Sequence, residues 1–130
     1  MAASATRNYL QDKGYNAAAA LTKFRAVKFS AAETVTPVTA DTDVIAGVVQ
    51  HDVTAGEILK GKGASIAVEG DTLMEAAGAI VAGALVTIDA SGLAVSGTAG
   101  DRIIGHCVEP AGGAGEYARV HLAPASGIHP

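Results

Sequence analysis

The sequence predicts an all-β protein, either a small β-sandwich or a barrel, and three observations support this class. The chain holds 13 valines, 8 isoleucines and 10 threonines against 7 leucines and 2 methionines. β-Branched side chains have few rotamers and suit a pleated sheet. The 16 glycines spread along 130 residues provide frequent turns. In addition, one sequence pattern occurs twice.

The repeated pattern indicates internal duplication of a β unit. Asp-Val-Ile-Ala-Gly at 43–47 is followed by Ala-Gly-Glu at 55–57. Asp-Arg-Ile-Ile-Gly at 101–105 is followed by Ala-Gly-Glu at 114–116. Each copy reads as a strand, a turn rich in glycine or proline, and a second strand. Neither copy contains an evident catalytic set.

Strands are expected where short apolar or alternating runs are bounded by turn residues. Pro37 restricts its run to a sheet edge or a strand end, and Gly47 predicts a bulge or tight packing. Gly92 predicts a three-residue hairpin loop, because glycine readily adopts a left-handed conformation. Residues 72–84 are expected to be a loop, with at most one helical turn. In chain order, the expected strands are 23–29, 34–38, 44–50, 65–68, 85–89, 93–96, 102–109 and 117–122.

Three segments are expected along the chain. Residues 1–19 are polar and show no sustained period of 2 or 3.6, so they predict an N-terminal arm that is flexible or ordered on a partner. Tyr9 and Tyr15 would anchor such an arm. Residues 20–123 form the β domain, and residues 124–130 are a loose C-terminal tail.

Composition limits the range of partners and compartments. The chain has 28 alanines, no tryptophan, 2 phenylalanines and 3 tyrosines, so oligomerisation is expected to supplement a thin core. A net charge of −4 without a basic block argues against direct nucleic-acid binding. No apolar run is long enough to predict a membrane span. Cys107 is the single cysteine, which excludes an internal disulfide and favours a reducing compartment.

Residues 56–63 nearly match the phosphate-binding pattern G-x-x-x-x-G-K-[ST]. Gly63 replaces the hydroxyl residue of that pattern, and a strand rather than a helix is expected to follow. We interpret the segment as a basic β-turn. Lys60 and Lys62 also raise the alternative of a biotinyl or lipoyl carrier domain. The residues flanking these lysines differ from carrier motifs, and Gly-Lys-Gly is a flexible context.

The histidines, acids and cysteine predict no metal site and no cofactor, because none has an established ligand spacing. Adjacent strand residues such as His106 and Cys107 point to opposite faces. Cys107 lies in an apolar run, where an inert buried thiol is expected. This expectation applies to His51, Asp52, Glu57, His106, Cys107, Glu109 and His121.

Residues 101–122, DRIIGHCVEPAGGAGEYARVHL, resemble the C-terminal end of small capsid decoration proteins of tailed bacteriophages, also called head cement or stabilisation proteins. In that family a strand with a Gly-containing ending is followed by an Ala/Gly turn, Gly-Glu and a closing strand. Residues 45–49 and 82–92 resemble it as well. The likeness covers about residues 20–123.

The resemblance implies a non-enzymatic virion protein, made in the bacterial host cytoplasm, that binds the outer surface of an expanded capsid. It implies a homotrimer that clamps neighbouring subunits of the major capsid protein, with the N-terminal arm lying on the shell. Two alternatives remain: the β carrier domain, and another self-assembling virion part such as a fibre base or tail-tube subunit. The expected capsid contacts are Arg7, Asn8, Tyr9, Lys13 and Tyr15, and Phe24 and Phe29 are expected in the core or a subunit interface.

Overall fold

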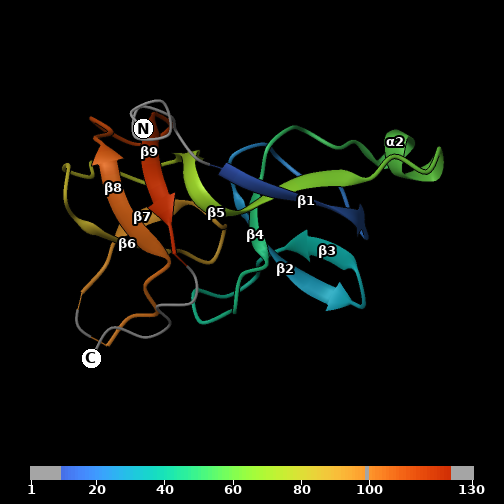
Figure 1. Ribbon diagram of the computed structural model, residues 1–130, viewed down its shortest axis with the longest axis horizontal. Coiled ribbons are helices and arrows are strands. Elements are labelled where there is room, and N and C mark those ends of the chain that lie inside the picture. The colour runs from blue at the N-terminus through green and yellow to red at the C-terminus, as the bar shows by residue number, and fades with distance from the viewer. Residues whose placement is uncertain (1–9, 99, 124–130) are drawn as a thin grey trace, which may run out of the picture.

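The computed structural model describes residues 10–98 and 100–123. These residues form two β lobes arranged along one long strand, β5 (Ala64–Glu75), as Figure 1 shows. The first half of β5 belongs to the lobe built from the N-terminal strands. Its second half belongs to the lobe built from the C-terminal strands. The predicted all-β class is confirmed.

The N-terminal lobe is a closed five-stranded barrel. Its strands are β1 (Leu10–Ala17), β2 (Ala26–Ala31), β3 (Thr34–Pro37), β4 (Gly47–Val49) and the first half of β5. They follow the order β1-β3-β2-β4-β5, and β5 pairs back onto β1 to close the ring. Only β1 and β3 run parallel in this ring. Because the ring is closed, each of its five strands has a hydrogen-bonded neighbour on both sides, and none is an open edge.

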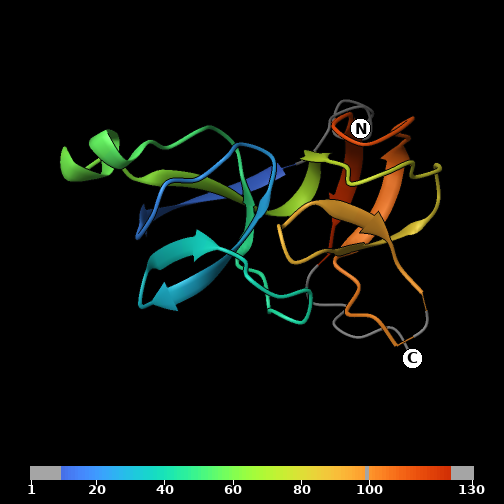
Figure 2. The same cartoon turned by 180° about the vertical axis from the view of Figure 1, so that it is seen from behind.

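The C-terminal lobe continues from the second half of β5. That half pairs with β9 (Tyr117–Leu122), followed by β8 (Gly105–Glu109), β6 (Leu85–Ile88) and β7 (Ala94–Ser96). A parallel bridge between Ala76 and Ala94 then connects the end of β5 to β7. This second sheet therefore also curls until its two edges meet, and Figure 2 shows the curl from behind.

Gly70 is the point at which β5 passes from one lobe to the other. It pairs with Leu10 of β1 and also with Leu122 of β9. Its φ of 98° lies in the left-handed region, where a side chain would be strained. Glycine at this position lets one strand turn between two sheets without a break in pairing.

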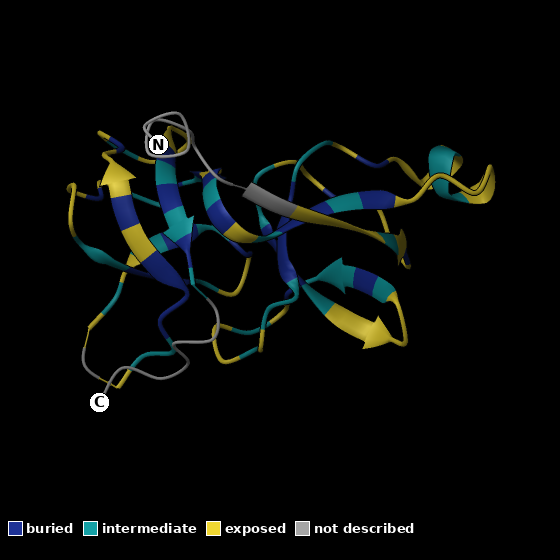
Figure 3. Ribbon diagram, viewed as in Figure 1, coloured by how far each residue is buried: buried dark blue, intermediate teal, exposed yellow. Residues whose placement is uncertain are grey.

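Each lobe has a cluster of buried residues, and the two clusters meet along β4 and β5. Val35, Val49 and Ile66 lie in the barrel cluster. Val48 and Ala67 also come from barrel strands, but they pack in the C-terminal cluster with residues such as Leu122. Successive residues of β4 and of this part of β5 therefore pack alternately into the two clusters. Figure 3 shows the buried positions along β4, β5 and β9.

The N-terminal boundary differs from the expected one. Residues 10–17 are strand β1 and not part of an arm, because they pair with β5 from Leu10↔Gly70 to Tyr15↔Ala64. Without β1, the facing edges of β3 and β5 would lose their backbone partners. The remainder of the expected arm, residues 1–9, and the expected tail, residues 124–130, lie outside the described residues.

Several element boundaries also differ from the sequence-based expectation. Residues 72–75 are strand and not loop, because Thr72 and Met74 point inward while Leu73 points outward. Residues 44–46 and 102–104 precede strands and do not belong to them. The expected hairpin at residues 85–96 is confirmed as the antiparallel pair β6–β7, with Gly92 at φ 80°. A short helix, α2 (Ala55–Leu59), was not predicted.

The sequence repeat corresponds to two similar antiparallel hairpins, β4–β5 and β8–β9. Gly47 begins β4 and packs on the carbonyl of Ala67, and Gly105 begins β8 and packs on the carbonyl of His121. A Cβ at either glycine would overlap that carbonyl. Of the two alternatives predicted at Gly47, a bulge or tight packing, the structure shows tight packing, and the repeat places the same close contact in each lobe.

Gly105→Ala is expected to lower the free energy of unfolding by roughly 1–3 kcal/mol, since the methyl group would force β8 away from β9. The control is Gly14→Ala in β1, where no heavy atom lies within 4 Å of the added Cβ. Urea unfolding of both variants measures the difference. Equal effects of the two substitutions would contradict the close packing at Gly105.

Candidate functional site

The aspartates of the repeated pattern hold backbone turns. Oδ2 of Asp43 accepts hydrogen bonds from the amides of Thr39 (2.9 Å) and Ala40 (3.0 Å). Oδ2 of Asp101 accepts from the amide (2.8 Å) and hydroxyl (3.1 Å) of Thr98. The amide of Thr39, then that of Ala40, lowers the pKa of Asp43, and Lys28 adds to the effect. Both aspartates are therefore committed to local structure.

The glutamates of the repeat have the same kind of role. Oε1 of Glu57 accepts from the Thr54 amide at 2.9 Å, while the Thr54 hydroxyl accepts from the Glu57 amide at 3.1 Å. This reciprocal pair is a capping box, and it explains why α2 begins here. In the second copy, Oε1 of Glu116 accepts from the Gly112 amide at 3.1 Å.

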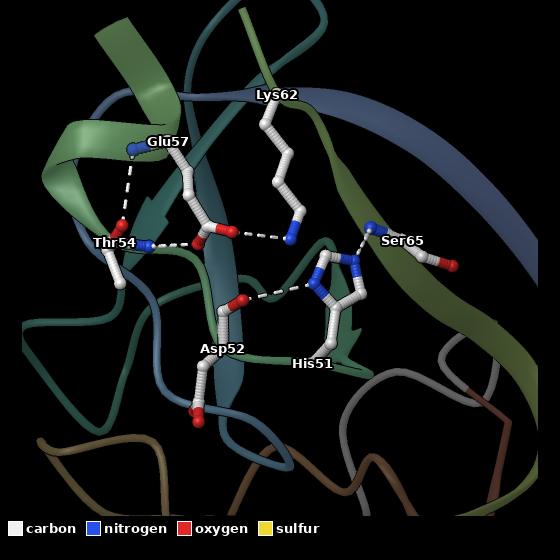
Figure 4. A network of polar contacts seen from close by, with 6 residues as sticks. All are labelled: His51, Asp52, Thr54, Glu57, Lys62 and Ser65. Atoms are coloured by element: carbon white, nitrogen blue, oxygen red, sulfur yellow. Dashed lines mark hydrogen bonds and ion pairs between the residues drawn. The ribbon is translucent and has the colours of Figure 1, made fainter. Parts of the chain in front are cut away.

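Lys62 completes the network around α2 that Figure 4 shows. Its Nζ lies 2.8 Å from Oε2 of Glu57. The hydrogen bond from Lys62, followed by the one from the Thr54 amide, lowers the pKa of Glu57 to about 2. Lys62 is thus held by an ion pair, and Lys60 is an exposed residue at the end of α2.

His51 also forms hydrogen bonds with backbone groups. The Ser65 amide donates to Nε2 of His51 at 3.1 Å, which leaves the ring proton on Nδ1, 3.2 Å from the Asp52 carbonyl oxygen. The Asp52 carboxylate accepts from the Lys23 amide at 2.8 Å. This arrangement joins the ends of strands and leaves no free imidazole nitrogen for proton transfer.

The near-match to a phosphate-binding loop folds differently from that motif. Residues 55–59 are helical and precede the Gly-Lys pair, whereas a phosphate loop requires its helix after the lysine. β5 follows at Ala64, as expected. The expectation of a simple β-turn is therefore wrong for residues 55–59, because the capping box at Thr54 starts a helical turn.

Two surface hollows do not assemble a catalytic set. The first, of about 300 Å³, is lined by Thr87, Asp89, Asp101 and Arg102 among others. Asp89 accepts from two amides of its own turn, as Asp101 does. Nε of Arg102 is buried without a hydrogen-bond partner in the described part of the chain. The neighbouring carboxylates disfavour an anionic ligand at this arginine. The second hollow, of about 590 Å³, lies beside His51.

Cys107 is buried, as predicted. Its thiol donates to the Glu109 carbonyl oxygen at 3.1 Å, and burial raises its pKa. His106 points to the opposite, exposed face, as predicted. The structure places His106 beside His121, with 5.3 Å between ring centroids. Within residues 10–98 and 100–123, no three His, Cys, Asp or Glu side chains are placed to hold one metal ion.

The four phenylalanine and tyrosine residues that the structure describes form two exposed or half-buried pairs. Tyr15 meets Phe29 edge to face at 5.1 Å between centroids, and Phe24 meets Tyr117 at 5.3 Å. Phe29 is 49% exposed and Phe24 is half-buried, so neither belongs to the buried clusters. Lys13 is exposed on β1.

The expected capsid contacts are only partly covered by the structure. Lys13 and Tyr15 lie on β1, whereas Arg7, Asn8 and Tyr9 lie outside the described residues. Their role in capsid binding stays a prediction.

Among the described helices, none has the length and apolarity needed to cross a membrane.

Comparison with known proteins gives a match at the level of structure. No family model and no curated protein sequence matches this chain. A solved structure described as the head fiber gp8.5 N base in bacteriophage phi29 superimposes with a TM-score of 0.64. The match covers 89% of this chain and 96% of that chain, at 16% sequence identity. At this identity the likeness establishes a shared fold along nearly the whole chain.

Glu57→Gln is expected to change how stability depends on pH. Because the folded-state pKa of Glu57 is about 2, below its ordinary value of 4.5, ionised Glu57 stabilises the fold above about pH 4.5. That contribution is lost as the pH falls toward 2. The difference in unfolding free energy between wild type and variant should shrink over this range, as measured by urea unfolding at several pH values.

The control for Glu57 is Glu69→Gln, which removes an exposed carboxylate that forms no ion pair among the described contacts. The lowered pKa of Glu57 would be contradicted if the unfolding free energies of wild type and Glu57→Gln changed in parallel between pH 4.5 and pH 2.

The Cys107 thiol is expected to resist a water-soluble disulfide reagent in the native protein and to react fully in urea. Burial both blocks access and disfavours the reactive thiolate. Cys107→Ala should cost about 1 kcal/mol of stability and leave function unchanged. Reaction of the native protein at the rate of the unfolded chain would refute this expectation.

Proposed function

We propose that this chain is a non-enzymatic structural protein of a tailed-phage virion that binds the outer surface of the expanded capsid. The observation that carries the proposal is the shared fold with a phage head fiber base over almost the full length of both chains. The commitment of Asp43, Asp101, Glu57 and Glu116 to turns and caps also supports a non-catalytic role.

The finer proposal is a decoration protein that acts as a homotrimer and clamps neighbouring major capsid subunits. Two lobes joined along β5 give the molecule an elongated shape, visible in Figure 1, which suits contact with two adjacent subunits. Exposed aromatic groups such as Phe29 offer anchoring positions. A protein that binds only the assembled shell stabilises it by mass action.

A fibre base is the second candidate, because the structural match is to the base of a head fiber. A base would attach to the head without clamping its subunits. The carrier-domain alternative has less support, since Lys62 is tied to Glu57 and both lysines follow the helix α2 in the connection between β4 and β5, not a tight hairpin turn.

Cosedimentation with expanded, empty heads of the virus that encodes this chain tests the proposal. We expect saturable binding to expanded heads and weak binding to unexpanded heads as the control. A rise in the disruption temperature of the shells would support clamping, whereas binding without such a rise would favour a fibre base. No binding to either form would overturn the proposal.

A further inference from the structure

We propose that His106 and His121 form a surface site for a divalent transition-metal ion of the zinc class. The two residues are direct partners across the antiparallel strands β8 and β9. Side chains of directly opposed residues lie on the same face of a sheet. His106 is exposed, and the side chain of His121 is 43% exposed, so both rings reach solvent on the outer face of the C-terminal lobe.

The separation of the rings fits coordination of one ion. Two imidazoles that bind a tetrahedral ion through nitrogens at about 2.0–2.1 Å hold their centroids roughly 5 Å apart. The centroids of His106 and His121 are 5.3 Å apart, with their planes inclined by 38°. The backbone register therefore supplies the required spacing without a change of fold.

Asp71 orients the His121 ring for metal binding through a hydrogen bond. Nδ1 of His121 lies 2.7 Å from Oδ1 of Asp71, which is its partner on β5. A proton on Nδ1 donated to the carboxylate leaves the lone pair on Nε2, and a carboxylate in this position orients metal-binding histidines and raises their basicity. Asp71, His121 and His106 thus form one row across three neighbouring strands.

Among residues 10–98 and 100–123, the groups around this site leave it with two protein ligands, His106 and His121. Glu109 is engaged with Arg119 at 2.6 Å, and Cys107 points into the core. Two positions of a tetrahedral ion would then be filled by water. The proposal is independent of capsid binding, because it concerns the chain's own affinity for an ion.

Isothermal titration of Zn²⁺ into the whole protein, with reversal by EDTA, tests the site. We expect one ion per chain, at least tenfold weaker binding for both His106→Gln and His121→Gln, and a 10–100-fold loss for Asp71→Asn. His51→Gln is the control and should bind as wild type does, because Nε2 of His51 is occupied by the Ser65 amide.

Imidazole NMR signals of the wild type give a readout that needs no variant. Zn²⁺ should shift the signals of His106 and His121 and leave those of His51 in place. Failure of the wild type to bind, or unchanged affinity in both histidine variants with native circular dichroism, would overturn the proposal.

Discussion

The continuity of β5 through Gly70 is the constraint on which the two-lobed structure depends. The first half of β5 pairs with β1 and closes the barrel, and its second half pairs with β9 and begins the second sheet. A residue with a side chain at φ 98° would be strained at the turning point. Because Val48 and Ala67 pack in the C-terminal cluster, the barrel and the second sheet also support each other through side chains.

Small residues make this arrangement possible in a chain with few large side chains. Gly47 and Gly105 allow two pairs of strands to approach more closely than any Cβ would permit. The polar residues near these glycines are then used to fix the connecting turns, as with Asp43 and Glu57. The polar groups named here thus stabilise the shape of the molecule.

On the outer face of the C-terminal lobe, strand register brings together side chains whose spacing in the sequence does not indicate a shared site. His106 and His121 are 15 positions apart in the sequence, and no ligand motif links them. Pairing of β8 with β9 places them opposite each other, and pairing of β9 with β5 adds Asp71. A shift of register by one residue would separate the rings and turn them to opposite faces.

The sequence by itself determined the all-β class, the β6–β7 hairpin and the buried thiol of Cys107, because each depends on local composition or alternation. Only the tertiary structure decided that residues 10–17 form a strand, since their polar sequence gains its partners from distant β3 and β5. The tertiary structure likewise decided the contact between His106 and His121 and the aromatic pair Tyr15–Phe29. Long-range pairing sets these contacts, and no local period encodes which strands become neighbours.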